Sequence, residues 1–150
     1  MVLLKRKDMD ADHQSAAAFI RDATPNDVPQ IAELIEPFVA RKQILPRSID
    51  EIGELVKNGF VAESGGNIVG FAAVEIYSKK LAELLCLAVS GPFQGRGVGR
   101  KLVDCCVERA RSKDVYEVMA ITADEQFFGS CGFHYILPEQ KRALFIRTRD

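Results

Sequence analysis

A glycine-rich loop between an apolar strand and an amphipathic helix is the feature that most limits what this chain can fold into. Residues 81–89 form an apolar run typical of a buried strand, and a helical pattern begins at Val98. Between and just after them stand Gly95, Gly97 and Gly99, which let the backbone approach a ligand closely. A helix start adds unpaired N–H groups and a positive dipole end. The pattern predicts an anion site, with a turn that merely needs glycine as the alternative.

Two common phosphate-binding motifs do not fit this loop. A nucleotide P-loop ends in Gly-Lys-Ser/Thr, whereas Gly99 is followed by Arg100 and Lys101. A dinucleotide-binding GxGxxG fingerprint that starts at Gly95 and Gly97 would need glycine at position 100. The anion is therefore of another kind.

The remaining sequence predicts one mixed α/β domain in the order β-α-α-β-β-β-α-β-α-β, and 150 residues are the usual size of one domain. Strands are expected over residues 19–21, 60–63, 68–76, 81–89, 115–121 and from 133 onward. Helices are expected after Thr24, after a capping box that starts at Ser48, from Val98, and over 125–130. Pro37 is expected to disturb the first helix near its end. Residues 1–18 show no period and are predicted to be a flexible arm or linker, which leaves 19–150 as the domain.

Composition excludes several classes of protein. A net charge of −1 gives no reason to expect a nucleic-acid partner. The opening segment has three consecutive apolar residues, too few for a signal-peptide core or a membrane span, so we predict a cytoplasmic protein that does not interact with membranes. The four cysteines form no CxxC pair and no Cys/His metal spacing, so reduced thiols and no metal are expected.

The glycine loop resembles the Q/R-x-x-G-x-G/A signature of the GNAT acetyltransferase superfamily, met here by Gln94, Gly97 and Gly99. The FFxxxGF stretch over 127–133 follows at a matching place, and the resemblance covers about residues 19–147. It implies an α/β GNAT fold: a central, mixed, mostly antiparallel sheet, splayed after strand four, with flanking helices. It also implies acetyl-CoA as the cosubstrate. The cofactor-binding residues are then Leu87, Ala88, Val89, Gln94, Gly95, Arg96, Gly97, Val98, Gly99, Arg100, Phe127 and Phe128.

Shorter stretches over 44–48, 60–63, 80–89 and 137–142 are similar to the acetyltransferase domain of bacterial N-acetylglutamate synthase. That resemblance implies N-acetylation of L-glutamate, the first step of arginine biosynthesis. The implied substrate-binding residues are Leu45, Arg47, Lys80, Cys86, Arg142 and Arg147. Arginine suits a dianionic amino acid because it grips a carboxylate through two parallel hydrogen bonds.

The same resemblance makes Glu83 the general base and Thr122 the hydroxyl that protonates the departing thiolate. A carboxylate inside an apolar run is costly unless it is paired or functional, and an ion pair with a neighbouring lysine is the plainer interpretation. Strand N–H groups near Leu87 and Val89 are expected to hold the acetyl carbonyl. The sequence departs from the pattern at Leu85, where many short members have arginine, and in a shorter C-terminus.

Several alternatives stay open at this stage. The amine acceptor is L-glutamate, another small amine or a protein amine. A regulatory module that binds acetyl-CoA without turnover is the alternative from another class. The sequence also leaves open a homodimer and a domain of a larger fusion.

Overall fold

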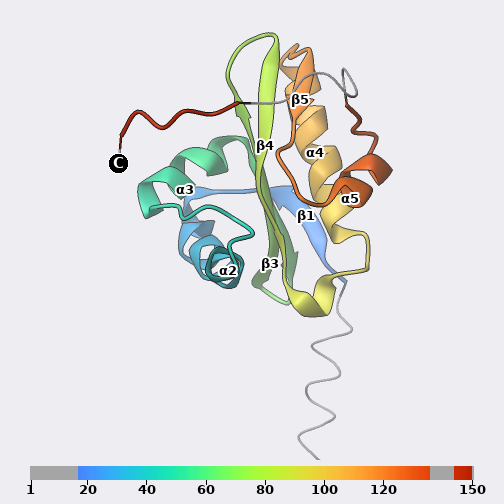
Figure 1. Ribbon diagram of the computed structural model, residues 1–150. Coiled ribbons are helices and arrows are strands. Elements are labelled where there is room, and N and C mark those ends of the chain that lie inside the picture. The colour runs from blue at the N-terminus through green and yellow to red at the C-terminus, as the bar shows by residue number, and fades with distance from the viewer. Residues whose placement is uncertain (1–16, 136–143, 150) are drawn as a thin grey trace, which may run out of the picture.

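The computed structural model describes residues 17–135 and 144–149, in which one five-stranded sheet lies between two layers of helices (Figure 1). The strands are β1 (Phe19–Asp22), β2 (Gly59–Ser64), β3 (Asn67–Ile76), β4 (Leu81–Val89) and β5 (Glu117–Met119). The α-helices are α2 (Val28–Ala40), α3 (Ile49–Leu55), α4 (Val98–Ser112) and α5 (Glu125–Ser130). Short 3-10 turns η1 (Pro25–Asp27), η2 (Val56–Asn58) and η3 (Gly91–Phe93) complete the order. No helix in this described part is both long and apolar enough to cross a membrane.

The sheet is mixed and splays open beyond its first four strands. Strands β1 to β4 pair antiparallel in sequence order, and β5 joins β4 in parallel. The β4–β5 pairing covers only residues 81–83 of β4, so the rest of β4 has no strand neighbour on that side within the described residues. This confirms the predicted splayed α/β sheet. The opened edge of β4 leads directly into the glycine loop.

A bulge in β4 decides which side chains face which helix layer. The pairing with β3 shifts by one residue opposite Ala72, and Cys86 has a left-handed backbone, with φ of 57°. Ala82 and Leu84 pack with α4. Cys86 and Ala88 pack with α2 and α3 instead. Because the side chains of a strand alternate, one extra residue exchanges the two faces.

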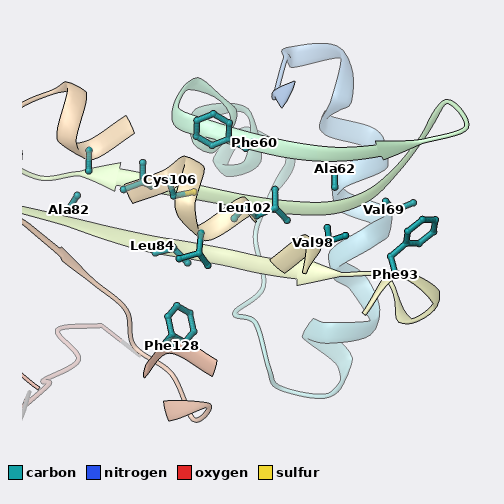
Figure 2. Packing of buried hydrophobic residues seen from close by; sticks show 14 residues of the cluster. Phe60, Ala62, Val69, Ala82, Leu84, Phe93, Val98, Leu102, Cys106 and Phe128 are labelled. Carbon is teal, nitrogen blue, oxygen red and sulfur yellow. The ribbon is translucent and has the colours of Figure 1, made fainter. Parts of the chain in front are cut away.

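The two faces carry separate apolar clusters. The cluster around α4 includes the fully buried Leu102, Val103 and Cys106 from that helix (Figure 2). The cluster under α2 and α3 includes Ile31 and Phe71, neither of which is exposed. These two clusters fix the sheet between its helices and hold β4 at the centre of the molecule.

Both predicted helix starts are confirmed. The backbone N–H of Thr24 donates to the Asp27 carboxylate at 2.8 Å, which opens η1 and then α2. The Ser48 hydroxyl accepts from the Glu51 N–H at 3.2 Å. The Ser48 N–H donates to the Glu51 carboxylate at 2.6 Å, so both bonds of a capping box are present. Helix α2 continues for three residues beyond Pro37 and ends at Ala40. The helix tolerates this proline because a proline near the end removes only one hydrogen bond.

The C-terminal strands differ from the prediction. Strand β5 spans three residues rather than the expected 115–121, because β4 diverges from it after Glu83 and leaves nothing to pair with. Residues 133–135 and 144–149 are not strand, so the strand predicted from 133 onward is wrong where the structure describes it. Arg142 and the rest of the 137–142 stretch lie outside the described residues.

Candidate active site

The glycine loop has a backbone that requires glycine at two positions. Gly95 and Gly97 have φ of 74° and 79°, in the left-handed region that other residues rarely adopt. A side chain at either position would meet no atom within 4 Å, so conformation rather than crowding demands glycine there. The Gln94 side-chain amide donates to the Val89 carbonyl at 2.8 Å, which ties the loop to the end of β4. The loop is therefore held open beside the splayed edge of the sheet.

The start of α4 concentrates positive charge. Gly97 is the N-cap and supplies no side-chain cap, so the first N–H groups of the helix are free for a ligand. Arg100 lies exposed in the first turn, where the helix dipole disfavours a cation. Arg96, also exposed, lies with its guanidinium 5.5 Å from the centre of the Phe93 ring. These cations at the positive end of a helix fit a bound polyanion such as the pyrophosphate of coenzyme A.

Not every predicted cofactor residue can offer a side chain. Ala88, Val98 and Phe128 are buried in the two clusters, so only their backbones can face a ligand. Leu87 and Val89, also predicted, are half-buried along the splayed edge of β4.

Two further predicted residues follow β5 in the chain. Phe127 is half-buried, and its ring lies 3.5 Å from the place of a Cβ on Gly99. Thr122 is exposed three residues beyond β5, and its hydroxyl accepts from the Asp124 N–H at 2.9 Å. Its proton remains free to be donated.

Arg47 and Cys86 meet on the face of the sheet that carries α2 and α3. The capping box at Ser48 fixes the backbone directly after Arg47. Burial raises the pKa of the Cys86 thiol, and the hydrogen-bonded guanidinium of Arg47 opposes that rise. The Arg47 Nε is buried and has no hydrogen-bond partner in the described part of the chain. An unpaired buried donor of this kind is uncommon and fits a site that completes its hydrogen bonds with a ligand.

Glu83 lies on the same face, closer to the turn between β3 and β4. The Tyr77 hydroxyl donates to Glu83 Oε2 at 2.5 Å. Glu75 stands directly opposite Glu83 on β3, and its Oε2 lies 3.3 Å from the same hydroxyl. Although the Tyr77 side chain is 51% exposed, partial desolvation raises the pKa of its phenol, as do the hydrogen bond to Glu83 and the charges of Glu83 and Glu75. The alternative interpretation, an ion pair between Glu83 and a lysine, is not formed with any described residue.

The other predicted substrate residues are scattered. Leu45 is 72% exposed on the loop that leads to Arg47. Lys80 is exposed in the turn between β3 and β4, and Arg147 is exposed in the segment 144–149. The described structure shows neither in contact with Arg47 or Glu83. Within residues 17–135 and 144–149, no group of three or more His, Cys, Asp or Glu side chains could hold a metal ion.

Sequence reasoning missed Glu75, Tyr77 and Glu117. Glu75 lies near the end of β3 and Tyr77 directly follows the strand, a weak signal in the sequence. Glu117 pairs with Leu81 and so shares the face of Glu83. This face therefore has an acidic end near the hairpin turn and a basic group at Arg47.

Comparison with known proteins agrees with this geometry. The model of the acetyltransferase (GNAT) family matches residues 28–135. An uncharacterized N-acetyltransferase of Chlorobaculum tepidum is 32% identical over 125 residues, which are 83% of this chain and 81% of that protein. An amino-acid acetyltransferase of Ralstonia nicotianae is 34% identical over 85% of this chain, but this chain spans only 30% of its length.

A solved structure supports the same assignment. N-acetylglutamate synthase of Neisseria gonorrhoeae, complexed with coenzyme A and N-acetyl-glutamate, superposes with a TM-score of 0.71 at 29% identity. The superposition covers 77% of this chain and 28% of the synthase. Because the family match spans more than half of its residues, the chain belongs to the acetyltransferase (GNAT) family and is an acetyl-CoA-dependent N-acetyltransferase.

Proposed function

We propose that this chain transfers the acetyl group of acetyl-CoA to the amino group of L-glutamate, the first step of arginine biosynthesis. Relatives named amino-acid acetyltransferase and the likeness to the gonococcal synthase support an amino-acid acceptor. These relatives are about 30% identical, so the choice of acceptor depends on the side chains of this chain.

The buried Nε of Arg47 is the observation that best supports this acceptor. Its buried Nε has no partner among the described residues, and a carboxylate is the natural acceptor for such a fork of N–H groups. Glu83, Glu75 and Glu117 give the far end of the same sheet face a negative charge. An α-amino acid fits this polarity, with its ammonium toward the carboxylates and a carboxylate toward Arg47.

The chemistry follows from the groups around the splay. Acetyl-CoA, when bound at the glycine loop, would supply a thioester whose carbonyl carbon is open to attack. Glu83 removes a proton from the acceptor ammonium, and the free amine attacks that carbon as the C–N bond forms. N–H groups near the β4 bulge hold the carbonyl oxygen as it becomes negative. When the C–S bond breaks, Thr122 donates its proton to the departing sulfur and takes up the second proton that the nitrogen loses as the amide forms.

Initial rates with acetyl-CoA and a panel of amino acids test the acceptor. We expect glutamate to exceed glutamine in kcat/KM by roughly 10–100-fold, the effect of one charge-assisted hydrogen bond in a partly desolvated site. Arg47→Ala should erase most of that preference and leave coenzyme A affinity unchanged by calorimetry.

The matched control is Arg41→Ala. Arg41 lies on the same connecting loop, with its guanidinium 5.0 Å from the Phe38 ring centre and its Nε donating to the Gln43 side chain. It should keep the preference for glutamate. Equal rates with glutamate and glutamine, or no rate with either, would instead favour another small amine or a protein amine.

A further inference from the structure

We propose that Tyr77 and Glu75 act together as positioning residues for Glu83, the first by pinning one oxygen of its carboxylate and the second by opposing its charge. The inference rests on the proposed role of Glu83 and deepens it. Glu75 belongs to β3, the strand antiparallel to β4, and Tyr77 directly follows that strand, with its N–H donating to the Leu81 carbonyl at 3.0 Å, so the hairpin itself builds the arrangement.

The hydroxyl of Tyr77 has one proton and two carboxylates within reach. Its distance is 2.5 Å to Glu83 Oε2 and 3.3 Å to Glu75 Oε2, so the proton is given to Glu83. With Oε2 occupied, the other oxygen of Glu83 is the one free to take a proton from the acceptor. Tyr77 thereby selects both the rotamer and the reactive oxygen of the base.

Glu75 is the second half of the device. Glu75 and Glu83 are directly opposed in the antiparallel pairing, where like charges destabilise a sheet. No described cation forms an ion pair with either carboxylate. The charge of Glu75 repels the charge of Glu83, whereas the Tyr77 hydrogen bond stabilises it. The two effects on the base have opposite signs.

Other charged groups border this part of the sheet and stay the same in every variant below. Glu117 shares the face from β5. Arg47 and Glu51 approach from the start of α3, next to Cys86. Lys79 donates its Nζ to the Lys113 carbonyl at 3.1 Å, and Lys80 is exposed in the same turn.

The pH dependence of kcat/KM separates the two contributions. Tyr77→Phe removes a hydrogen bond to the charged base, so the acidic limb should move to higher pH by about half a unit or more. The rate at the optimum should fall about tenfold, as expected for one hydrogen bond to a charged group. Glu75→Gln removes a like charge, so its acidic limb should move to lower pH. The ionisation of the acceptor is common to all variants and cancels in the comparison.

Tyr116→Phe is the matched control, since Tyr116 is 83% exposed beside β5 and shows no contact with these carboxylates. Its profile should coincide with that of the unmodified protein. Limbs that do not move in Tyr77→Phe and Glu75→Gln, or that move in the same direction, would overturn the inference. A loss of rate in Glu83→Gln combined with unmoved limbs would overturn it while leaving the role of Glu83 intact. Full turnover in Glu83→Gln would remove that role, and the inference with it.

A measurement without turnover checks the contact itself. The chain has three tyrosines, so replacing Tyr116 and Tyr135 by phenylalanine leaves Tyr77 as the only phenol. Its absorbance titration should begin at higher pH than that of a free tyrosine and move down when Glu83→Gln is added, with circular dichroism to confirm folding. An unchanged titration would show that Glu83 does not hold the phenol, and would overturn the inference whatever the acceptor.

Discussion

Two clusters of charged side chains in this molecule are built in opposite ways. Near the start of the domain, Arg21 donates to both oxygens of Asp27 at 2.8 Å and reaches Glu63 at 3.4 Å. Thr24 adds its N–H and its hydroxyl to the same aspartate. At the far end of the sheet, the Glu75–Glu83 pair has a tyrosine but no described cation in contact.

The two clusters differ in what completes them. The hydrogen bonds from Arg21, partly offset by burial, lower the pKa of Asp27 to about 2, together with bonds from Thr24 and the charge of Arg21. That cluster is satisfied within the protein and contributes to stability. The carboxylate pair has no described cation in contact, the Arg47 Nε has no described hydrogen-bond partner, and Gly97 gives α4 no side-chain cap, as is typical of sites that await a ligand. Four predictions, from the largest effect to the smallest, test this contrast.

Glu83→Gln should have the largest effect, on rate and not on stability. Loss of the base should lower turnover by roughly 10²–10⁴-fold. The thermal midpoint should stay the same or rise, because the substitution relieves the repulsion with Glu75. Steady-state kinetics and calorimetric melting measure the two quantities on one preparation. A fall in the melting temperature that parallels the fall in rate would place Glu83 among the stabilising charges instead.

Gly97→Val should have the second-largest effect, a loss of affinity for coenzyme A. A β-branched residue at φ of 79° is strained, and the loop can relieve that strain only by moving the N–H groups at the start of α4. We expect a roughly 10–100-fold weaker Kd by calorimetry, from about 1–3 kcal/mol of strain. Gly91→Val is the control, since Gly91 has no positive φ and equal open space. Equal affinities in the two variants would remove the loop from the cofactor site.

Asp27→Asn should lower the free energy of unfolding by about 2 kcal/mol at neutral pH, as expected for a carboxylate whose pKa falls from 3.8 to about 2 on folding. The folded state has the lower pKa, so the stabilisation is complete above about pH 4. It is lost as the pH falls through 2. Urea unfolding at pH 7 and at pH 3 measures this: the gap between variant and unmodified protein should narrow at pH 3. A gap that is constant over this range would mean that Asp27 stabilises by packing alone.

Glu54→Gln should have the smallest effect. Glu54 and Lys57 form an ion pair of 2.7 Å in which both side chains are mostly exposed, at 73% and 66%. Solvent screens such pairs, so the change in unfolding free energy should stay below about 0.5 kcal/mol. If Glu54→Gln lowered the free energy of unfolding as much as Asp27→Asn, burial would not explain the difference between the two ion pairs.

The success of sequence reasoning varied with how local the signal was. The capping box at Ser48 and the bounds of α5 were predicted correctly, because a helix start or stop depends on neighbouring residues. The splayed sheet and the family were also confirmed. The shortened β5 was not foreseen, because a strand ends where its partner leaves it, and the course of β4 is not encoded next to Glu117.

The sequence by itself determined the glycine loop, the helix after it and the presence of a carboxylate in an apolar strand, since each depends on residues close in the chain. The tertiary structure decided which groups surround that carboxylate. The bulge at Cys86 exchanges the faces of β4, and the register with β3 places Glu75 opposite Glu83. A shift of one residue in that register would turn Glu83 to the other face of the sheet. Strand register is set by packing across the whole sheet, and no short stretch of sequence contains it.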